Sequence, residues 1–587
     1  MGTQKKTWGT IKELCNGNTK PSITEIFHDG VRYNETKDIA SIFNQFFVTI
    51  ANNLAEALPQ SSISPYLYVD PNASPPIQHT PVSHEEVSNI IKSMKVTKTG
   101  VHEISINLFK KYHMFFLPCL CDMINLCLST GIFPDCLKIA IVIPIFKKGH
   151  ASDVSNYRPI ALLPFLSKII ERCIFDRLSI YASSCNLIGP AQFGFRKGKS
   201  THDAITLITE NIYEAFNIGN GTFNINIFID FQKAFDTIDH AILLNKLRIY
   251  GITGTFHDLI KNYLSNRFQS VRVGDCLSSP LKITKGVPQG SVLGSLLFLL
   301  FISDLPNVSG ILTSILFADD LALSFTCNDA NECNIICNRE LNRLFEWSAS
   351  NKLSINYGRT KSYFMINTYG NIEQDAFNIN INGITLENVS QAKYLGVVLD
   401  PKLKFNKHID YIAEKISKST GILYKLKKLK IPIQILKQIY YSLIYSIINY
   451  NICAYGGTYN THINRLFLLQ KRAIRLICGE SFLAHTDPLF YRTQILKIHD
   501  IYRLNVAVYM FEARHSGEFD RNHPYPTRSY NDLVPIYARL NVTQNYLKVS
   551  GPNVWNSIPQ EIRNLPSLSM FKNRYKKYLL SLYIQEN

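Results

Sequence analysis

Two adjacent carboxylates interrupt an apolar stretch of the chain, residues 315–325. The Ile, Leu, Ala and Phe residues of this stretch predict a buried β-hairpin with Asp319 and Asp320 at its turn. An unpaired carboxylate is costly to bury, and a bound divalent cation removes that cost. Mg²⁺ prefers oxygen ligands and usually takes one or two protein carboxylates, leaving other positions to phosphate oxygens. The pair is therefore a candidate site for phosphoryl transfer, and a simple aspartate turn is the alternative.

A third carboxylate, Asp230, stands where a second predicted strand ends. Residues 223–230 begin as an alternation of apolar residues and Asn, and an acidic turn then leads to a helix predicted at 240–251. Alone, Asp230 would be an ordinary aspartate at the end of a strand. The Gly- and Pro-containing loop 285–291 opens an apolar helix predicted at 292–304. We expect the free N–H groups of that helix to face an anion or a base.

Basic residues stand at the ends of predicted apolar elements, as the wall of a groove requires. Lys147 and Lys148 follow a strand predicted at 139–146. Residues 192–201 combine glycines with Arg196, but they do not form a Walker A loop, because Phe193 stands where that loop needs its first glycine. Glycine beside arginine would let the chain approach a triphosphate. A solvated basic turn fits the same pattern, and both interpretations stay open.

The composition favours a polyanionic partner. The chain carries 62 Lys and Arg against 45 Asp and Glu, a formal net charge of +17. The 13 cysteines contain no Cys-x₂-Cys pair and no Cys/His cluster at zinc spacing, which argues against a disulfide framework and predicts a reducing compartment. No signal peptide is predicted, and the most apolar stretches, 292–302 and 439–455, are too short or too polar to span a bilayer. We expect no membrane partner.

The remaining pattern divides the chain into four predicted parts. Helices are predicted at 38–58, 106–130, 165–185 and 331–351, and a strand at 393–399. Ser83, with Glu86 three residues later, predicts a helix start after a Pro- and Ser-rich linker. The predicted parts are an N-terminal extension and linker (1–82), a central domain (83–400), a basic helical region (401–480) and a C-terminal tail (481–587).

Six blocks carry a resemblance to a known family. In order, they are residues 156–159 (NYRP), 192–196 (QFGFR), 230–236 (DFQKAFD), 286–291 (GVPQGS), 317–320 (FADD) and 394–397 (YLGV). Together they resemble the reverse transcriptases of non-LTR retrotransposons of the jockey and chicken-repeat kind. The core of the resemblance spans residues 128–400, and a weaker one continues to the C-terminus.

The resemblance implies a fold and a metal centre. The fold would be an α+β right hand with fingers, a palm built on an antiparallel sheet and a helical thumb, extended at both ends. Asp230, Asp319 and Asp320 would meet on the palm and hold two Mg²⁺ or Mn²⁺ ions, with Asp230 and Asp319 as the principal ligands. Such ions activate a primer 3′-hydroxyl and neutralise the departing pyrophosphate.

The resemblance also implies nucleotide-binding positions. Phe235 falls at the sugar gate, where a bulky ring excludes a ribose 2′-hydroxyl and so favours DNA as the product. Gln289 would lie along the incoming nucleotide, and Arg196 and Arg158 near its triphosphate. Lys361 would be the nearest ammonium group to the pyrophosphate.

Three departures from the family pattern bear on these expectations. Arg359 stands where the family usually has Lys, and an arginine cannot donate a proton near neutral pH. His102 replaces the usual Asp in the Gly-x-Asp-x-Ile block at 100–104. Complete elements also carry an endonuclease, which the chain has no room for, so we expect a polymerase without one.

The expected function is that of an RNA-directed DNA polymerase. It would copy an RNA template from a DNA or RNA primer with deoxynucleoside triphosphates, as part of a non-LTR retrotransposon. The alternatives are a catalytically inactive or co-opted RNA-binding relic, and an RNA polymerase with a gate that admits ribonucleotides. The expected location is intracellular, nuclear and cytoplasmic, without secretion.

Overall fold

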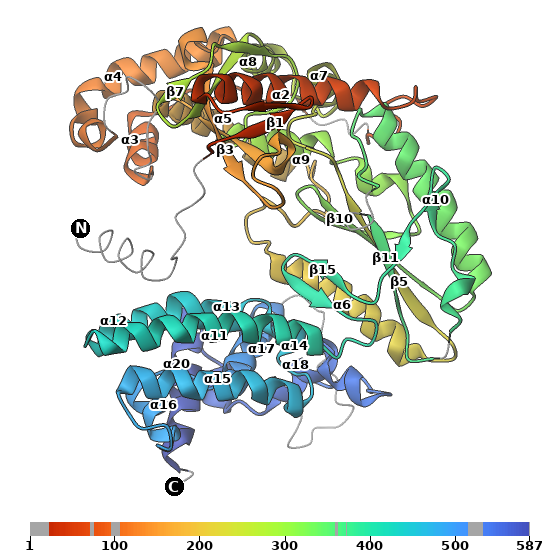
Figure 1. Cartoon of the computed structure of the whole chain (residues 1–587), viewed down its shortest axis with the longest axis vertical. Coiled ribbons are helices and arrows are strands. Elements are labelled where there is room, and N and C mark those ends of the chain that lie inside the picture. Colours follow the sequence, from red (N-terminus) through yellow and green to blue (C-terminus); the bar gives the residue numbers. More distant parts are fainter. Residues whose placement is uncertain are drawn as a thin grey trace.

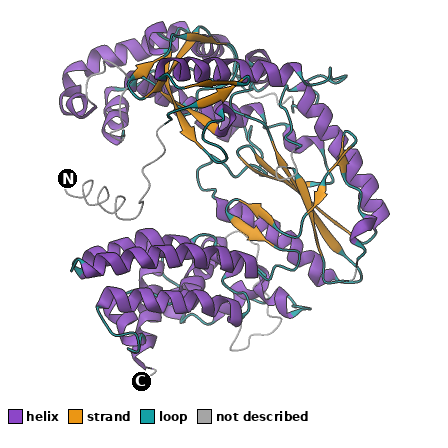
Figure 2. Ribbon diagram, in the orientation of Figure 1, coloured by secondary structure: helices purple, strands orange, loops and turns teal. Residues whose placement is uncertain are grey.

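The computed structural model describes residues 23–70, 75–94, 106–357, 362–370, 372–514 and 532–585. His102, Arg359 and Lys361 lie outside these ranges. Figure 1 shows three parts that follow one another in a curve: an upper part of helices and strands, a sheet with its helices at the right, and a layer of helices below. Figure 2 shows that the strands belong to the upper part, to the sheet and to a small hairpin between the sheet and the lower helices.

The upper part is a sheet covered by helices. The sheet has the order β4-β3-β6-β7, with β8 also paired to β6, and β3 runs antiparallel to β4 and parallel to β6. Its strands are β3 (Ile139–Phe146), β4 (Tyr157–Leu162), β6 (Arg267–Val273), β7 (Cys276–Leu277) and β8 (Leu281–Ile283). The helices are α2 (Thr36–Glu56), α3 (His84–Ser93), α4 (Ile106–Thr130), α5 (Phe165–Ser184), α7 (His240–Ile249) and α8 (Gly254–Leu264), and a hairpin of β1 (Ile26–His28) and β2 (Val31–Tyr33) precedes them.

Several local predictions in this part are confirmed. The helix at 106–130 and the strand at 139–146 have the predicted bounds. The Ser83 hydroxyl accepts a hydrogen bond from the Glu86 backbone N–H at 3.1 Å and so begins α3. The segment predicted as an N-terminal extension packs on the sheet through α2, where buried Asn44 donates to the backbone oxygens of Gln269 and Ser279.

Among the described helices, α4 is long and apolar enough to cross a membrane by length and composition. One side of it is buried, including Leu117, Ile124 and Leu128, and it packs against α3, α5 and α8. A core helix passes the same test of length and composition, and 39% of the most apolar window of α4 is buried inside the structure.

A second sheet forms the part at the right of Figure 1. Its order is β14-β11-β5-β10-β9, and β9, β10, β5 and β11 are antiparallel. The strands are β5 (Phe223–Asp230), β9 (Thr313–Phe317), β10 (Asp320–Cys327), β11 (Tyr363–Asn367) and β14 (Glu387–Asn388), and a short hairpin of β12 (Asn380–Ile381) and β13 (Ile384–Thr385) lies beside α10. Helices α9 (Leu293–Phe301) and α10 (Ala330–Ser350) share a core with one face, and α6 (Thr201–Ile218) with the other. Only the short edge strand β14 runs parallel to its neighbour, β11, so the fold is α+β with a mainly antiparallel central sheet.

The alternation of Asn with apolar residues in β5 does not mark a solvent face. Asn224 and Asn226 are 1% and 0% exposed. Asn224 donates to the Ser324 hydroxyl at 3.1 Å, and Asn226 donates to the Asn367 side-chain oxygen at 3.0 Å. The side-chain N–H groups of both amides donate to side chains on neighbouring strands, so both faces of β5 can be buried.

The segment 393–399 was predicted as one strand, and that prediction is wrong. It forms a hairpin of β15 (Ala392–Tyr394) and β16 (Val397–Leu399). Leu395 and Gly396 at its turn have φ of 43° and 82°. A positive φ at both central residues is typical of a tight hairpin turn, which an apolar sequence with a single glycine concealed.

The lower part consists of helices with one shared core. Its elements are α11 (Asn406–Lys428), α12 (Ile433–Tyr440), a π-helical turn (Tyr441–Tyr445), α13 (Ser446–Asn449), α14 (Ile452–Tyr455), α15 (Asn460–Cys478), α16 (Asp487–Thr493), α17 (Ile498–Ala513), α18 (Leu547–Asn556), α19 (Gln560–Arg563) and α20 (Leu568–Gln585). The buried residues of 401–480 and those of the described tail belong to a single cluster. In the tail, Tyr546 and Lys548 both donate to Glu214 of α6 and so join this part to the second sheet.

A buried histidine makes the stability of this part depend on pH. His408 of α11 is 2% exposed, and burial lowers its pKa to about 4, with Lys415 and Lys393 adding to the effect. The unfolded chain binds a proton at this residue near pH 6.5, whereas the folded chain does not until about pH 4. Stability from this residue is therefore complete above pH 6.5 and is lost as the pH falls, by about 3 kcal/mol in all.

We expect His408→Gln to flatten this dependence. Urea unfolding of parent and variant at pH 7 and pH 4.5 measures it, because the constant cost of the substitution cancels in the difference between the two pH values. An equal loss of stability in both proteins on acidification would contradict the assignment.

Candidate active site

The structure brings the three predicted aspartates to one end of the second sheet. Asp230 ends β5 and is paired in register with Asp320, which begins the antiparallel β10. Asp319 precedes it in the β9–β10 turn. The predicted hairpin is confirmed, and the pairing of its second strand with β5 carries the third carboxylate to the same place.

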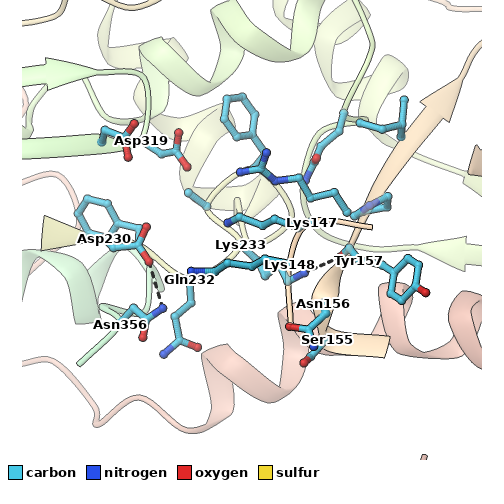
Figure 3. Close-up of a pocket in the computed structure, with 18 residues that line it drawn as sticks. Lys147, Lys148, Ser155, Asn156, Tyr157, Asp230, Gln232, Lys233, Asp319 and Asn356 are labelled. Carbon is cyan, nitrogen blue, oxygen red and sulfur yellow. Dashed lines mark hydrogen bonds between the residues drawn. The ribbon is translucent and has the colours of Figure 1, made fainter. Parts of the chain in front are cut away.

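The aspartates line a cavity of about 530 Å³ whose opposite wall is basic. Figure 3 shows Asp230 and Asp319 on one side and Lys147 and Lys148 across from them. The full lining is Lys147, Lys148, Ser155, Asn156, Tyr157, Arg158, Pro159, Ile160, Asp230, Phe231, Gln232, Lys233, Ala234, Phe235, Gln289, Asp319, Asp320 and Asn356. Of the residues predicted to bind the nucleotide, Arg158, Phe235 and Gln289 line this cavity.

Burial and neighbouring carboxylates raise the pKa values of Asp319 and Asp320. Burial raises the pKa of Asp319, and the charge of Asp230 adds to the rise. Burial, followed by the charges of Asp319 and Asp230, raises the pKa of Asp320 to about 6, while Lys147 and Arg158 oppose the effect. Closely spaced carboxylates with raised pKa values favour a cation that neutralises them. Within the described residues, no three acidic, His or Cys side chains lie close enough to form a ready ion site.

Asp230 is held by two residues, Asn356 and Ser362, that the sequence analysis did not single out. The Asn356 side-chain amide donates to the Asp230 carboxylate at 3.1 Å, as the dashed line in Figure 3 shows, and the Asn356 backbone N–H donates to the Asp230 carbonyl at 2.8 Å. The Asp230 N–H donates to the Ser362 hydroxyl at 3.3 Å. These contacts orient the carboxylate toward the cavity.

The turn that carries Asp319 is held by Gln192. The Gln192 side-chain oxygen accepts hydrogen bonds from the N–H groups of Gly194 and Ala318, at 2.8 and 2.9 Å, and Gln192 is 4% exposed. Ala318 has φ of 55°, and a side chain on Gly194 would place its Cβ 2.3 Å from the Ala318 nitrogen. The close approach of the two segments therefore requires glycine at 194.

The same segment does not carry Arg196 to the cavity. The Arg196 guanidinium donates to the carbonyl oxygens of Gly189 and Gln192, at 2.7 and 3.2 Å, within its own loop. In place of Arg196, the cavity has Lys147, Lys148 and Lys233. The first two follow a strand, as the sequence indicated. Lys233 was not singled out, and it donates to the Tyr157 carbonyl at 3.1 Å from a backbone with φ of 48°.

Gln289 is positioned by Asp236, a partly buried aspartate. Its side-chain amide donates to both carboxylate oxygens of Asp236, at 2.8 and 2.9 Å, and burial raises the pKa of Asp236 to about 6. Gly286, with φ of 77°, packs so tightly on this turn that a Cβ there would lie 2.5 Å from the Asp236 carbonyl oxygen.

The N-terminus of α9 is not free for a ligand, which corrects the expectation from its sequence. The backbone N–H groups of Val292 and Leu293 donate to the Glu171 carboxylate at 2.7 and 3.3 Å. Glu171 lies on α5 and is fully buried. A carboxylate from the protein already occupies the position that a bound anion would take.

A smaller cavity of about 150 Å³ shares two of the aspartates. It is lined by Phe228, Ile229, Asp230, Asp320, Leu321, Tyr363, Lys393 and Tyr394. Asp230 and Asp320 thus stand in the wall between this cavity and the larger basic one. Lys393 comes from β15, and its ammonium donates to the Tyr411 hydroxyl of α11 at 3.0 Å.

Much of the chain is similar to known proteins. Residues 145–399 match the family described as reverse transcriptase (RNA-dependent DNA polymerase). The chain is 30% identical over 470 residues to a probable RNA-directed DNA polymerase from transposon BS of Drosophila melanogaster, covering 78% of this chain and 50% of the relative. It is 30% identical over 436 residues to the RNA-directed DNA polymerase from mobile element jockey of Drosophila funebris, covering 72% and 46%. The chain spans about half the length of these curated relatives.

Proposed function

We propose that the chain, whose residues 145–399 match the reverse transcriptase family, copies an RNA template into DNA as part of a non-LTR retrotransposon. The observation that carries the proposal is the pairing of Asp230 with Asp320 beside Asp319, on the wall of a cavity whose other side is basic. We propose further that the upper part, the second sheet and the lower helices serve as fingers, palm and thumb (Figure 1).

Asp230, Asp319 and Asp320 would hold the metal ions. Two bound Mg²⁺ or Mn²⁺ ions would supply charge neutralisation and an activated primer hydroxyl. Burial and the neighbouring carboxylates raise the pKa values of Asp319 and Asp320, and a bound cation would offset both effects. Mg²⁺ takes only one or two protein carboxylates and completes its shell with phosphates and water, so a site completed by the nucleotide needs no preformed cluster.

The larger cavity would bind the incoming nucleotide. Lys147, Lys148 and Arg158 offer positive charge to the triphosphate, opposite the aspartates. Phe235 lines the same cavity, where its ring would meet the sugar and exclude a 2′-hydroxyl. Gln289, held by Asp236, would lie along the nucleotide.

The smaller cavity would receive the primer end. Because Asp230 and Asp320 stand between the two cavities, a primer hydroxyl on one side and a nucleotide phosphate on the other would meet at the carboxylates. Positive charge continues from this cavity onto α11, since the ammonium groups of Lys393 and Lys415 lie 4.4 and 4.0 Å from the Tyr411 ring centre. We propose that the template–primer duplex follows this basic path.

The test is primer extension on an RNA template with Mg²⁺ or Mn²⁺. We expect deoxynucleotides to be incorporated, and ribonucleotides far less efficiently. If the protein is folded, as shown by a cooperative unfolding transition, but extends no primer, the result would contradict the proposal and favour a relic that only binds RNA. Preferred incorporation of ribonucleotides would favour an RNA polymerase.

Gln192→Ala should slow extension without unfolding the protein. The substitution leaves the buried N–H groups of Gly194 and Ala318 without their acceptor, at a cost of about 1–3 kcal/mol, and frees the turn that carries Asp319. We expect the rate of a single turnover to fall about 10-fold or more, as for other small misplacements of catalytic groups. Gln192→Glu keeps an acceptor and should retain more activity. Gln438→Ala, an exposed glutamine on α12, is the control, and equal rates for the parent and Gln192→Ala would contradict the role.

A further inference from the structure

The ring of Phe235 contacts two other aromatic rings. Behind it lies Phe298 of α9, with ring centres 4.3 Å apart and ring planes 23° apart. On another side lies Phe195, edge-on, at 6.2 Å and 89°. Phe298 is 1% exposed, whereas Phe195 is 59% exposed. The ring that faces the nucleotide cavity is therefore stacked on a ring that belongs to the protein core.

The two neighbours of Phe235 differ in how firmly they are held. Phe298 lies in α9 among fully buried residues such as Leu297 and Phe301, so its ring cannot move without opening the core. Phe195 sits in a loop with φ of 54° and is largely exposed. A fixed position for Phe235 must therefore come from Phe298.

A sugar gate works only if its ring does not yield. The gate rejects a ribonucleotide through a steric clash between its ring and the 2′-hydroxyl. If the ring can rotate away, the clash disappears and the ribonucleotide is accepted. Phe235 is only half-buried and lies in a turn rather than in a helix or strand. Stacking on a partner of fixed orientation, worth about 0.5–1.5 kcal/mol for such a pair, would keep the ring in the excluding position.

We propose that Phe298 is a specificity-determining residue that acts through Phe235: it positions the gate from the core side and does not itself contact the nucleotide. The proposal rests on the function proposed above. In this proposal, the buried face of α9 helps the enzyme to select deoxynucleotides over ribonucleotides.

The test compares single insertions of dCTP and CTP opposite a template G in RNA. The ratio of the two kcat/KM values is the readout, because it does not depend on how much of the protein is folded. We expect Phe298→Leu to lower the discrimination against CTP by about 2- to 10-fold, the range that corresponds to the loss of an aromatic pair. Phe298→Met, which keeps the volume of the side chain but not its flat ring, should do the same if Phe298→Leu folds poorly.

Two further variants separate the possible results. Phe301→Leu is the control, because Phe301 is equally buried on α9 but its ring faces Lys246 at 5.0 Å, and its ratio should match the parent's. Phe235→Ala should lower the ratio further than Phe298→Leu, and the double variant should equal Phe235→Ala. A normal ratio in both Phe298 variants, with a reduced one in Phe235→Ala, would overturn the role of Phe298 and leave the polymerase and its gate in place. A normal ratio in Phe235→Ala would overturn the gate together with its support.

Discussion

Asp319→Asn is expected to reduce RNA-templated DNA synthesis by about 10³-fold or more, because it removes a metal ligand and so weakens both positioning and charge stabilisation. Asp319 stands in the turn between β9 and β10, at the cavity, and burial raises its pKa. Asparagine has nearly the same shape but carries no charge, so the hairpin should form as before. Single-turnover extension with saturating nucleotide measures the loss.

Asp122→Asn is the matched control for this substitution. Asp122 is an exposed aspartate on α4, and its loss changes the net charge of the protein by the same amount. We expect the activity of this variant to equal that of the parent. Thermal unfolding should show that Asp319→Asn remains folded; activity close to the parent's in a folded Asp319→Asn protein would remove Asp319 from the mechanism.

Asp304→Ala is expected to lower the free energy of unfolding by about 3–5 kcal/mol, because it leaves a buried charge without its partner. Lys246 of α7 lies 2.7 Å from Asp304, and the side chains of both are 0% exposed. Lys246 also donates to the Phe301 carbonyl at 2.9 Å, and the Trp347 indole of α10 donates to Asp304 at 3.0 Å. This network joins α7 of the upper part to α9 and α10 of the second sheet.

Urea unfolding followed by tryptophan fluorescence measures this loss. Asp176→Ala removes the partly exposed pair with Arg172 on α5 and is the control, with an expected effect below about 1 kcal/mol. The double variant Lys246→Met with Asp304→Leu should recover much of the stability, because it removes both charges and keeps apolar volume. If Asp304→Ala lowered the free energy of unfolding by less than 1 kcal/mol, the Lys246 ammonium would not need the Asp304 carboxylate to be stable in the core.

The fold was most predictable where the pattern is local. The helix at 106–130 and the strand at 139–146 follow from apolar periodicity and from β-branched content, and both have the predicted bounds. The hairpin turn at Leu395 and Gly396 was missed because its signal is one glycine in an apolar run. The burial of Asn224 and Asn226 could not be foreseen, since their partners come from strands about 100 and 141 residues away in the chain.

In the site too, residues in local sequence patterns were predictable, and contacts between distant segments were not. Asp230, Asp319 and Asp320 could be chosen because acidic residues in apolar strands are unusual and because the family motifs contain them. The role of Gln192 could not be predicted, because the group it holds is a backbone N–H of Ala318, 126 residues away in the chain. Asn356 escaped notice for a similar reason, since it reaches Asp230 from 126 residues later. Arg196 was a candidate triphosphate ligand, with a solvated basic turn as the alternative, and its guanidinium donates within its own loop.

The most direct measurement is RNA-templated extension by four proteins: the parent, Asp230→Asn, Asp319→Asn and the double variant. Residues that act as one unit lose activity together, so each single substitution should cost nearly as much as both. The predicted result is a Mg²⁺- or Mn²⁺-dependent parent and three variants with equally low activity. Parent-like extension by a folded Asp230→Asn protein would contradict a shared metal site at the paired ends of β5 and β10.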